Sequence, residues 1–335
     1  MERALVSILI PFKNTAKFLP ECLQSIMDQH FKDWEVIAVD DHSTDNSREI
    51  VNAYALKNPG IKVFDNEGNG IIPALRTAYK RSEGSYITRM DSDDIMKPHK
   101  LSTLVSLLNK NGKGSLAVGK VQYFSERGIS NGYKRYEDWL NKLTLHGTNF
   151  SERYKECVIP SPCWMLHRED LDRCGAFDHG RYPEDYDLAF RMYQAGLQCL
   201  ACDEVLHLWR DYDTRTSRTS IHYAQNYFLD IKLFYFLKLD WDPERPIVVW
   251  GAGKKGKTIA RSLLEKKIPF HWVCDNPNKI GRNIYSKTMK SYTAVHSLQD
   301  PQSIITVANE DAQQLITSFF NSLEKKSMDD YFFFC

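Results

Sequence analysis

The sequence lacks several features that would assign it to a class at once. No apolar run approaches the roughly 20 residues that a membrane-spanning helix needs. Lys and Arg total 44 against 43 Asp and Glu, a net charge of +1, so there is no overall electrostatic preference for nucleic acid. The chain has no internal repeats and no low-complexity tracts. At 335 residues and 42% hydrophobic content, it is long enough for one large domain with an appendage, or for two domains.

The cysteines do not form a framework. The chain has eight, and Cys199 and Cys202 make a lone C-x-x-C without a second pair or a nearby histidine, which argues against zinc. We therefore expect reduced thiols, as in a cytosolic protein. Met1-Glu2-Arg3 leads directly into a predicted strand without the pattern of a signal peptide, which also indicates a cytoplasmic location.

The first half of the chain alternates short apolar runs with segments of helical periodicity, a pattern typical of an α/β sheet whose active residues follow the carboxyl ends of the strands. We predict strands at 5–10, 34–39, 61–64 and 85–88. Helices are predicted at about 15–29, after a cap at Asp45 or Asn46, and at about 74–80.

From about Ser115 the pattern is less regular, and we expect the aromatic-rich segment 123–154 to form loops over a cleft. A short helix is predicted near 169–173, another from Pro183, one or two strands between 199 and 209, and a long helix at about 221–239 that closes the first domain. Residues 240–246 carry two prolines and four charges and make the best linker candidate. The predicted domains are therefore 1–240 and 241–335, the latter a small α/β unit.

The densest cluster of charge is Met90-Asp91-Ser92-Asp93-Asp94, directly after a predicted strand. If the strand continues, Asp91 and Asp93 project to the same side, where a hard cation such as Mg²⁺ or Mn²⁺ would relieve their repulsion. The alternative is a solvated acidic turn before a helix. Asp41 follows a neighbouring strand in the same way, and this coincidence favours a functional site.

Glu184 and Asp185 lie in the first turn of a predicted helix, near its buried stripe, where the helix dipole favours anions. Simple helix capping is the alternative role for this pair.

The small C-terminal unit contains a G-x-G-x-x-G motif between a predicted strand and a predicted helix, and an acidic residue follows the next strand. Its members are Gly251, Gly253, Gly256 and Asp275. The motif is typical of dinucleotide binding, but the glycines equally allow a tight turn with close helix–strand packing. About ninety residues are too few for a complete NAD-dependent oxidoreductase.

Taken together, these motifs resemble family-2 glycosyltransferases of the GT-A fold, and the resemblance covers nearly the whole chain. The C-terminal unit resembles the Rossmann-like domain appended to some bacterial members. The resemblance implies a nucleotide-sugar domain with a mixed central sheet, followed by a small Rossmann-like domain. The segments that carry the main resemblance are Val6–Asn14, Val39–Asp45, Met90–Asp94 and Pro183–Arg191.

The resemblance also implies roles at the donor side. Asp41 would accept a hydrogen bond from the base, uracil in most relatives, in a pocket shaped by Pro11, Phe12 and Asn14. Asp91 and Asp93 would hold the ribose and a divalent metal, Mn²⁺ or Mg²⁺, on the donor diphosphate. Asp94 would support them or cap the next helix. Arg76 and Arg89 would assist at the diphosphate, with surface roles as the alternative.

At the acceptor side, the resemblance selects Asp185 as the general base and Glu184 as the residue that orients it. A single displacement then inverts the anomeric carbon. Trp164 would form an aromatic wall for the acceptor, and an ordinary core position is the alternative. The acceptor implied is a cell-envelope glycan or a lipid-linked saccharide, which would bring the protein to the inner face of the membrane as a peripheral protein.

One residue departs from the family pattern. Segment 209–218 resembles the loop that often supplies a histidine to the metal, and here Tyr212 takes that position. Asp211 or Asp213 would substitute, or the metal would rely on Asp93 and phosphate. A Gln-x-x-Arg-Trp signature of processive synthases is missing, which favours transfer of one sugar per encounter. A non-catalytic nucleotide- or glycan-binding protein remains the alternative from another class.

Overall fold

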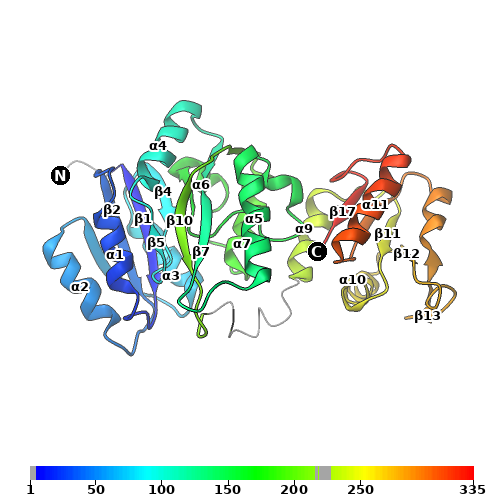
Figure 1. The fold of residues 1–335 in the computed structure, drawn as a ribbon, viewed down its shortest axis with the longest axis horizontal. Helices are drawn as coiled ribbons and strands as arrows, with labels where there is room; N and C mark the ends of the chain where they lie inside the picture. Colours follow the sequence, from blue (N-terminus) through cyan, green and yellow to red (C-terminus); the bar gives the residue numbers. More distant parts are fainter. Residues whose placement is uncertain (1–4, 216–217, 219–227) are drawn as a thin grey trace. The chain divides into compact units, whose positions relative to one another are not determined.

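A computed structural model describes residues 5–215, 218 and 228–335 of the chain. These residues pack as two compact units (Figure 1): the first comprises residues 5–150 and 157–215, and the second comprises 151–156, 218 and 228–335. The division into domains 1–240 and 241–335 stays a prediction, and Met1–Arg3 lies outside the described residues. So does the first part of the helix predicted at 221–239, whose described part begins at Leu229.

The first unit is an α/β domain, as the sequence predicts. Its elements in chain order are β1 (Val6–Phe12), α1 (Leu19–Met27), β2 (Trp34–Asp40), α2 (Ser47–Lys57), β3 (Ile61–Asp65), α3 (Ile71–Arg81), β4 (Tyr86–Arg89), β5 (Ile95–Met96), α4 (Lys100–Asn111), β6 (Ser115–Val118), β7 (Lys120–Phe124), α5 (Asn131–His146), β8 (Trp164–His167), α6 (Arg168–Arg173), α7 (Glu184–Gln194), β9 (Gln198–Leu200) and β10 (Val205–Arg210); a short 3₁₀ turn, η1 (Asn149–Glu152), follows α5.

The central sheet of this unit has seven strands in the order β3-β2-β1-β4-β8-β6-β9. The first four are mutually parallel, and β8 runs antiparallel to both β4 and β6. A smaller sheet, β5-β10-β7, stands beside it in the same unit. The predicted mixed central sheet is therefore confirmed, and the carboxyl ends of β1, β2 and β4 meet at one edge.

Helices cover both faces of the central sheet. In β1 every residue is buried. Successive side chains point to opposite faces of the sheet, and both faces are covered. Ile8 and Ile10 pack with α1 and α4 on one face, whereas Leu9 packs with α3 and α7 on the other. This explains why the strand reads as a continuous apolar run instead of an alternating one.

The segment predicted as loops at 123–154 is instead largely the sixteen-residue helix α5. The Ser130 side chain caps its first turn by accepting a hydrogen bond from the amide of Tyr133, and Gly147 ends it in the left-handed conformation at φ 65°. Aromatic side chains spaced along the helix, among them Tyr136 and Trp139, pack against the core. The high aromatic content that suggested loops is the buried face of an amphipathic helix.

The second unit is built on a five-stranded parallel sheet in the order β15-β12-β11-β16-β17. Its elements are α9 (Leu229–Leu239), β11 (Ile247–Trp250), α10 (Lys254–Glu265), β12 (Phe270–Cys274), β13 (Asn283–Ile284), β14 (Lys287–Thr288), β15 (Lys290–Ser291), the 3₁₀ segment η2 (Tyr292–Ser297), β16 (Gln302–Ile305), α11 (Glu310–Ser322) and β17 (Tyr331–Phe333). Helix α9, which the sequence analysis assigned to the first domain, packs in this unit.

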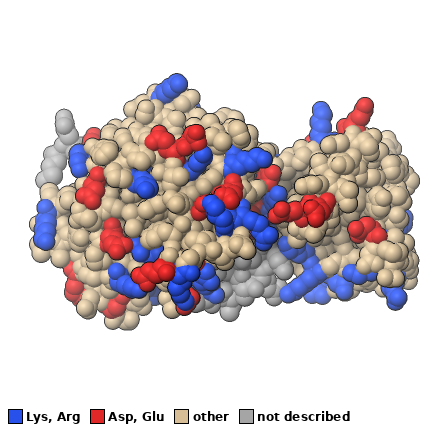
Figure 2. Space-filling view, viewed as in Figure 1, with Lys and Arg blue, Asp and Glu red and all other residues tan. Residues whose placement is uncertain are grey.

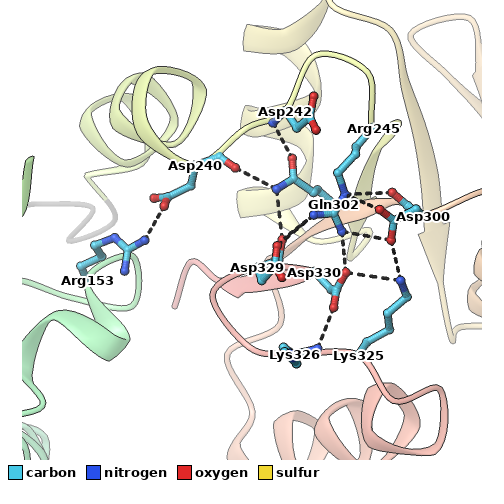
Figure 3. A network of polar contacts seen from close by, with 10 residues as sticks. All are labelled: Arg153, Asp240, Asp242, Arg245, Asp300, Gln302, Lys325, Lys326, Asp329 and Asp330. Carbon is cyan, nitrogen blue, oxygen red and sulfur yellow. Dashed lines mark hydrogen bonds and ion pairs between the residues drawn. The ribbon is translucent and has the colours of Figure 1, made fainter.

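The charged segment 240–246, predicted as a linker, is bound into the second unit (Figure 3). The Arg245 guanidinium donates to Asp329 at 2.9 Å and to Asp330 at 2.5 Å, and its Nε lies 3.1 Å from Asp300. The side chain of Gln302 donates to the Asp240 carbonyl at 2.8 Å. The segment rich in proline and charge is therefore a turn held by ion pairs and hydrogen bonds, and not a loose linker.

None of the eight cysteines, all of which lie within the described residues, is joined in a disulfide. None of the helices in the described part of the chain is both long and apolar enough to cross a bilayer.

Candidate functional site

Polar side chains from three neighbouring parallel strands gather at the carboxyl edge of the central sheet. Asp41 directly follows β2, and Asp91 lies two residues after the end of β4. Strand β1 lies between β2 and β4 in the sheet, and the Asp41 amide donates to the carbonyl of its last residue, Phe12, at 2.9 Å. Ligand sites of open α/β sheets lie at such an edge.

The Asp41 carboxylate lies in a buried polar pocket. Its Oδ1 accepts hydrogen bonds from the Asn66 side chain at 2.6 Å and from the Gly70 amide at 2.8 Å, while its Oδ2 lies 3.2 Å from the Lys13 ammonium. Asp41 is 6% exposed, but the Lys13 side chain is 52% exposed. A ligand that binds Asp41 can therefore do so by displacing Lys13. Sequence reasoning identified Asp41 but neither Asn66 nor Lys13.

Three other predicted donor-side residues lie at the end of β1 and in the turn that follows it. Asn14 has φ 51°, and its Oδ1 accepts from the Thr44 amide at 2.7 Å, which joins the β1–α1 turn to the β2–α2 loop. Pro11 and Phe12 are buried in β1, and their part in a donor pocket stays a prediction.

The acidic turn departs from the predicted extended strand. β4 ends at Arg89, and the Asp94 amide donates to the Asp91 carbonyl at 3.2 Å, which closes a turn. The alternation expected for a strand therefore does not apply to Asp91 and Asp93. Each of the three carboxylates instead has its own partners.

Arg89 joins the two acidic motifs. Its guanidinium is 3% exposed and donates through one terminal nitrogen to Asp91 at 2.7 Å and through the other to Glu184 at 3.0 Å. Burial raises the pKa of Asp91, but the charge and hydrogen bond of Arg89 outweigh it and hold that pKa below its ordinary value. A surface role for Arg89 is excluded.

The Asp93 carboxylate is buried beside other negative charges. Burial and the negative charges of Asp94 and Asp91 raise its pKa to about 7, although Arg215 opposes this shift. Its Oδ2 accepts a hydrogen bond from the Tyr212 hydroxyl at 2.8 Å. The residue at the family's histidine position therefore does contact the acidic turn, as a hydrogen-bond donor to Asp93.

Asp94 supports the turn from beneath. It is fully buried and accepts from the Arg210 amide at 2.8 Å, and its Oδ2 lies 3.0 Å from Nε2 of His207. The other ring nitrogen of His207 lies 3.2 Å from the ammonium of buried Lys100. His207 has no exposed surface, so it serves the turn and is closed to solvent. Single-sequence reasoning had no signal for this histidine or this lysine.

Helix α7 supplies the second acidic motif. Pro183 precedes its first residue, Glu184. Burial, followed by the negative charge of Glu184, raises the pKa of Asp185 to about 7, while Arg89 opposes the shift. Its Oδ1 also accepts from the Tyr186 amide at 2.8 Å, which opposes the shift. Capping alone therefore does not account for the raised pKa, because a capping carboxylate is stabilised in its charged form. A carboxyl group with a pKa near neutrality is suited to exchanging protons at physiological pH.

The remainder of this motif is structural. Asp187 is 1% exposed and accepts from Arg191 one turn later at 2.8 Å. Arg191 also donates to the Ala176 carbonyl at 2.8 Å. Arg191 therefore ties α7 to the chain that precedes it.

Two predicted residues are not brought into the cluster. Arg76 donates to the carbonyls of Phe177 and Asp178, at 3.2 and 3.1 Å, and so holds a surface turn. Trp164 is 2% exposed within the core between the sheet and α7. The predicted acceptor wall is wrong for Trp164, because a buried ring offers no surface to a ligand.

The glycine motif of the second unit is explained by packing. Gly251 has φ 128°, and a Cβ there would lie 2.3 Å from Oγ1 of Thr306. A Cβ on Gly256 would lie 2.1 Å from the Gly251 carbonyl oxygen. In contrast, a Cβ on Gly253 meets nothing within 4 Å, and Asp275 is exposed. Two of the three glycines are thus required by the strand–helix contact itself.

Within the described residues, no group of three or more His, Cys, Asp or Glu side chains is arranged to hold a metal. Asp93 does offer a carboxylate oxygen in a position where negative charges crowd together. Such a site fits a hard cation that takes its remaining oxygens from a substrate, as Mg²⁺ does with phosphates.

The sequence profile described as "Glycosyl transferase family 2" matches residues 7–175, which include Asp41 and the whole acidic turn. The chain belongs to this family, and its first unit has the GT-A fold. It is accordingly a glycosyltransferase, an enzyme that transfers sugars.

Among curated proteins, the chain is 27% identical over 221 residues to Glycosyltransferase GlyG of Streptococcus pneumoniae, covering 64% of this chain and 73% of GlyG. It is 32% identical over 214 residues to the uncharacterized glycosyltransferase EpsJ of Bacillus subtilis, covering 62% of this chain and 61% of EpsJ. A Rickettsia conorii relative is 26% identical, and the chain spans 46% of its length.

Solved structures share the fold at low identity. The S. aureus TarS 1–349 complex with UDP-GlcNAc superposes with a TM-score of 0.54 at 19% identity, covering 71% of this chain and 68% of TarS 1–349. The Pyrobaculum calidifontis mannosyltransferase PcManGT, in complex with GDP-Man and Mn²⁺, gives a TM-score of 0.52 at 18% identity, covering 96% and 81% of the two chains.

Proposed function

We propose that this chain is a metal-dependent, inverting glycosyltransferase that moves a sugar from a UDP-sugar to the hydroxyl of a glycan or lipid-linked acceptor. The observation that carries the proposal is the bridge made by Arg89. One buried guanidinium holds Asp91, just after β4, and Glu184, at the start of α7, so the donor motif is tied to the residue next to the candidate base Asp185.

The donor would bind along the carboxyl edge of the sheet. Asp41 would accept a hydrogen bond from the base, in the place that Lys13 takes in the structure. Asp91 would face the ribose, and Asp93 would hold the divalent metal. A divalent metal held there would neutralise the negative charge that develops on the departing diphosphate. Binding of UDP and GDP sugars by fold neighbours makes the nucleotide-sugar class a natural choice, and UDP is our specific proposal.

Asp185 would act as the general base. The acceptor oxygen attacks the anomeric carbon, the bond from that carbon to the diphosphate oxygen breaks, and the electron pair leaves with the nucleoside diphosphate. The acceptor hydroxyl proton passes to the Asp185 carboxylate. One displacement inverts the carbon and requires no protein nucleophile. The pKa of about 7 at Asp185 lets it accept this proton near neutral pH.

Release of nucleoside diphosphate from UDP- and GDP-sugars with and without Mn²⁺ tests the proposal. We expect slow Mn²⁺-dependent release of UDP in the wild type, and loss of release in Asp93→Ala and Asp185→Asn. Asp138→Asn is the matched control, because Asp138 is a surface residue paired with Lys134 within α5. If the wild type binds UDP but releases none from any donor, and the three variants behave in the same way, the protein is a non-catalytic binding protein.

A further inference from the structure

One surface of the second unit carries far more positive charge than the chain as a whole. Between Lys254 and Lys290 the sequence has ten Lys and Arg but only two acidic residues, Glu265 and Asp275. The net charge of this segment is +8, whereas that of the whole chain is +1. In the second unit, Lys and Arg side chains gather over α10 (Figures 1 and 2).

Helix α10 presents these charges as a stripe. Lys254, Lys257 and Arg261 recur at intervals of three and four residues and are exposed, so they lie on one side of the helix. Ile259 and Leu263 are buried and pack toward the sheet. The helix is therefore amphipathic, with a cationic outer side.

A hairpin continues the stripe. β13 and β14 pair antiparallel around a two-residue turn, Tyr285–Ser286, in which both residues have positive φ, 51° and 59°. Arg261 of α10 donates to the Tyr285 hydroxyl at 2.9 Å, and its guanidinium lies 5.5 Å from the ring centroid. Trp272 stacks behind the same ring at 6.2 Å. The helix and the hairpin thus form one continuous surface.

Two more lysines border this surface. Lys279 donates to the Ala252 carbonyl at 3.1 Å, which ties the turn before the hairpin to the glycine turn before α10. The Lys287 ammonium lies 5.4 Å from the Phe270 ring centroid. We call this surface the basic face, and it consists of Lys254, Lys257, Arg261, Lys279, Tyr285 and Lys287.

We infer that the basic face binds the surface of a bilayer that contains anionic phospholipid. The charges match an anionic surface, and each Lys or Arg that reaches it strengthens binding about fivefold. Large apolar side chains are exposed within this charged segment, since Tyr285 and Ile280 are each 39% exposed. Tyrosine is favoured at the membrane–water interface, and an exposed isoleucine contributes apolar burial there. This combination favours a bilayer over a nucleic acid.

The inference does not rest on the proposed transfer reaction, because vesicle binding requires no donor and no metal. Sedimentation of the full chain with vesicles tests it, using phosphatidylcholine alone and phosphatidylcholine mixed with phosphatidylglycerol. The charge variant is Lys254→Gln/Lys257→Gln/Lys287→Gln. Its matched control is Lys57→Gln/Lys110→Gln/Lys142→Gln, three exposed lysines on helices of the first unit.

We expect the wild type and the control to bind the mixed vesicles and not the neutral ones, with binding weakened by salt. The charge variant should bind the mixed vesicles on the order of 100-fold more weakly. Tyr285→Ser should weaken binding while leaving its salt dependence unchanged. Asp93→Ala should bind as the wild type does, which separates this outcome from failure of the transferase proposal.

Equal binding by the charge variant and its control would overturn the inference, as would equal binding to neutral and mixed vesicles. Displacement of the protein from mixed vesicles by a DNA duplex, at a lower phosphate concentration than that of the lipid, would assign the face to nucleic acid instead. Thermal unfolding of each variant shows whether a loss of binding reflects a loss of folding, and Tyr285→Ser supplies a second variant without a change of charge.

Discussion

Replacement of Arg89 by methionine is the perturbation that should reveal most about the cluster. Methionine preserves much of the apolar stem but removes the charge that Asp91 and Glu184 share. Removing one partner of a buried ion pair costs about 3–5 kcal/mol, because the remaining charge is left unpaired. For a cooperative unit of about 200 residues, the size of the first unit, that loss corresponds to a fall in Tm of roughly 6–20 °C.

The same substitution should change the pH dependence of activity. Arg89 lowers the pKa of Asp185, which burial and Glu184 raise to about 7. Without the guanidinium, this pKa rises further, because a nearby positive charge favours the ionised carboxylate. If Asp185 is the base, it must be deprotonated to act, so the rise of activity with pH moves to higher pH.

Thermal unfolding and the pH profile of UDP release measure these two effects. Arg173→Met is the matched control, because Arg173 forms a pair with Asp170 but its own side chain is 55% exposed, so its loss should cost at most about 1 kcal/mol. Adding Glu184→Gln to Arg89→Met should recover part of the lost stability. An Arg89→Met protein within about 0.5 kcal/mol of the wild type, the usual range of surface substitutions, would refute the reasoning.

The remaining predictions concern single positions. In the wild type, UDP release should fall as the pH drops below about 7, because Asp185 takes up a proton and loses its capacity as a base; a flat profile from pH 5 to 8 would argue against this role. Tyr212→His should tighten Mn²⁺ binding in isothermal titration, because it places a nitrogen ligand where the hydroxyl now meets Asp93; unchanged affinity would exclude Tyr212 from the metal site. Gly256→Ala should destabilise the second unit by more than the roughly 1 kcal/mol typical of point substitutions, because its Cβ would lie 2.1 Å from a carbonyl oxygen. Gly253→Ala is the control, since a Cβ there meets open space and should change stability little. Equal denaturation midpoints for the two variants would contradict the packing role of the motif.

Much of the first unit could be predicted because its signals are local. Strands buried on both faces appear as continuous apolar runs, and β1 and β2 were located within a residue or two in this way. The helix α5 was missed because its aromatic residues were attributed to loops; their spacing along one side of a helix, together with Ser130 before it and Gly147 after it, was the signal that could have identified it.

The site was predictable in part for the same reason. Asp41, Asp91 and Asp93 follow strands that are recognisable from sequence, and parallel strands bring their carboxyl ends to one edge. Arg76 and Trp164 failed as site residues because nothing in a single sequence shows which way a side chain points or what covers it. His207 and Lys100 are more than 100 residues apart in the chain but adjacent beneath the acidic turn, and no local pattern relates them.

The sequence by itself determined the class of fold, the order of the motifs and the carboxylates at the strand ends, because hydrophobic periodicity and strand order act over a few residues at a time. Only the tertiary structure decided which charges meet. The Arg89 contact with Glu184 spans 95 positions and the Tyr212 contact with Asp93 spans 119. The first requires α7 to pack beside the end of β4, and the second requires β10 to pair with β5 next to the acidic turn. The basic face likewise depends on Arg261 reaching Tyr285 across the unit, since separate stretches of lysine become one surface only when the chain folds.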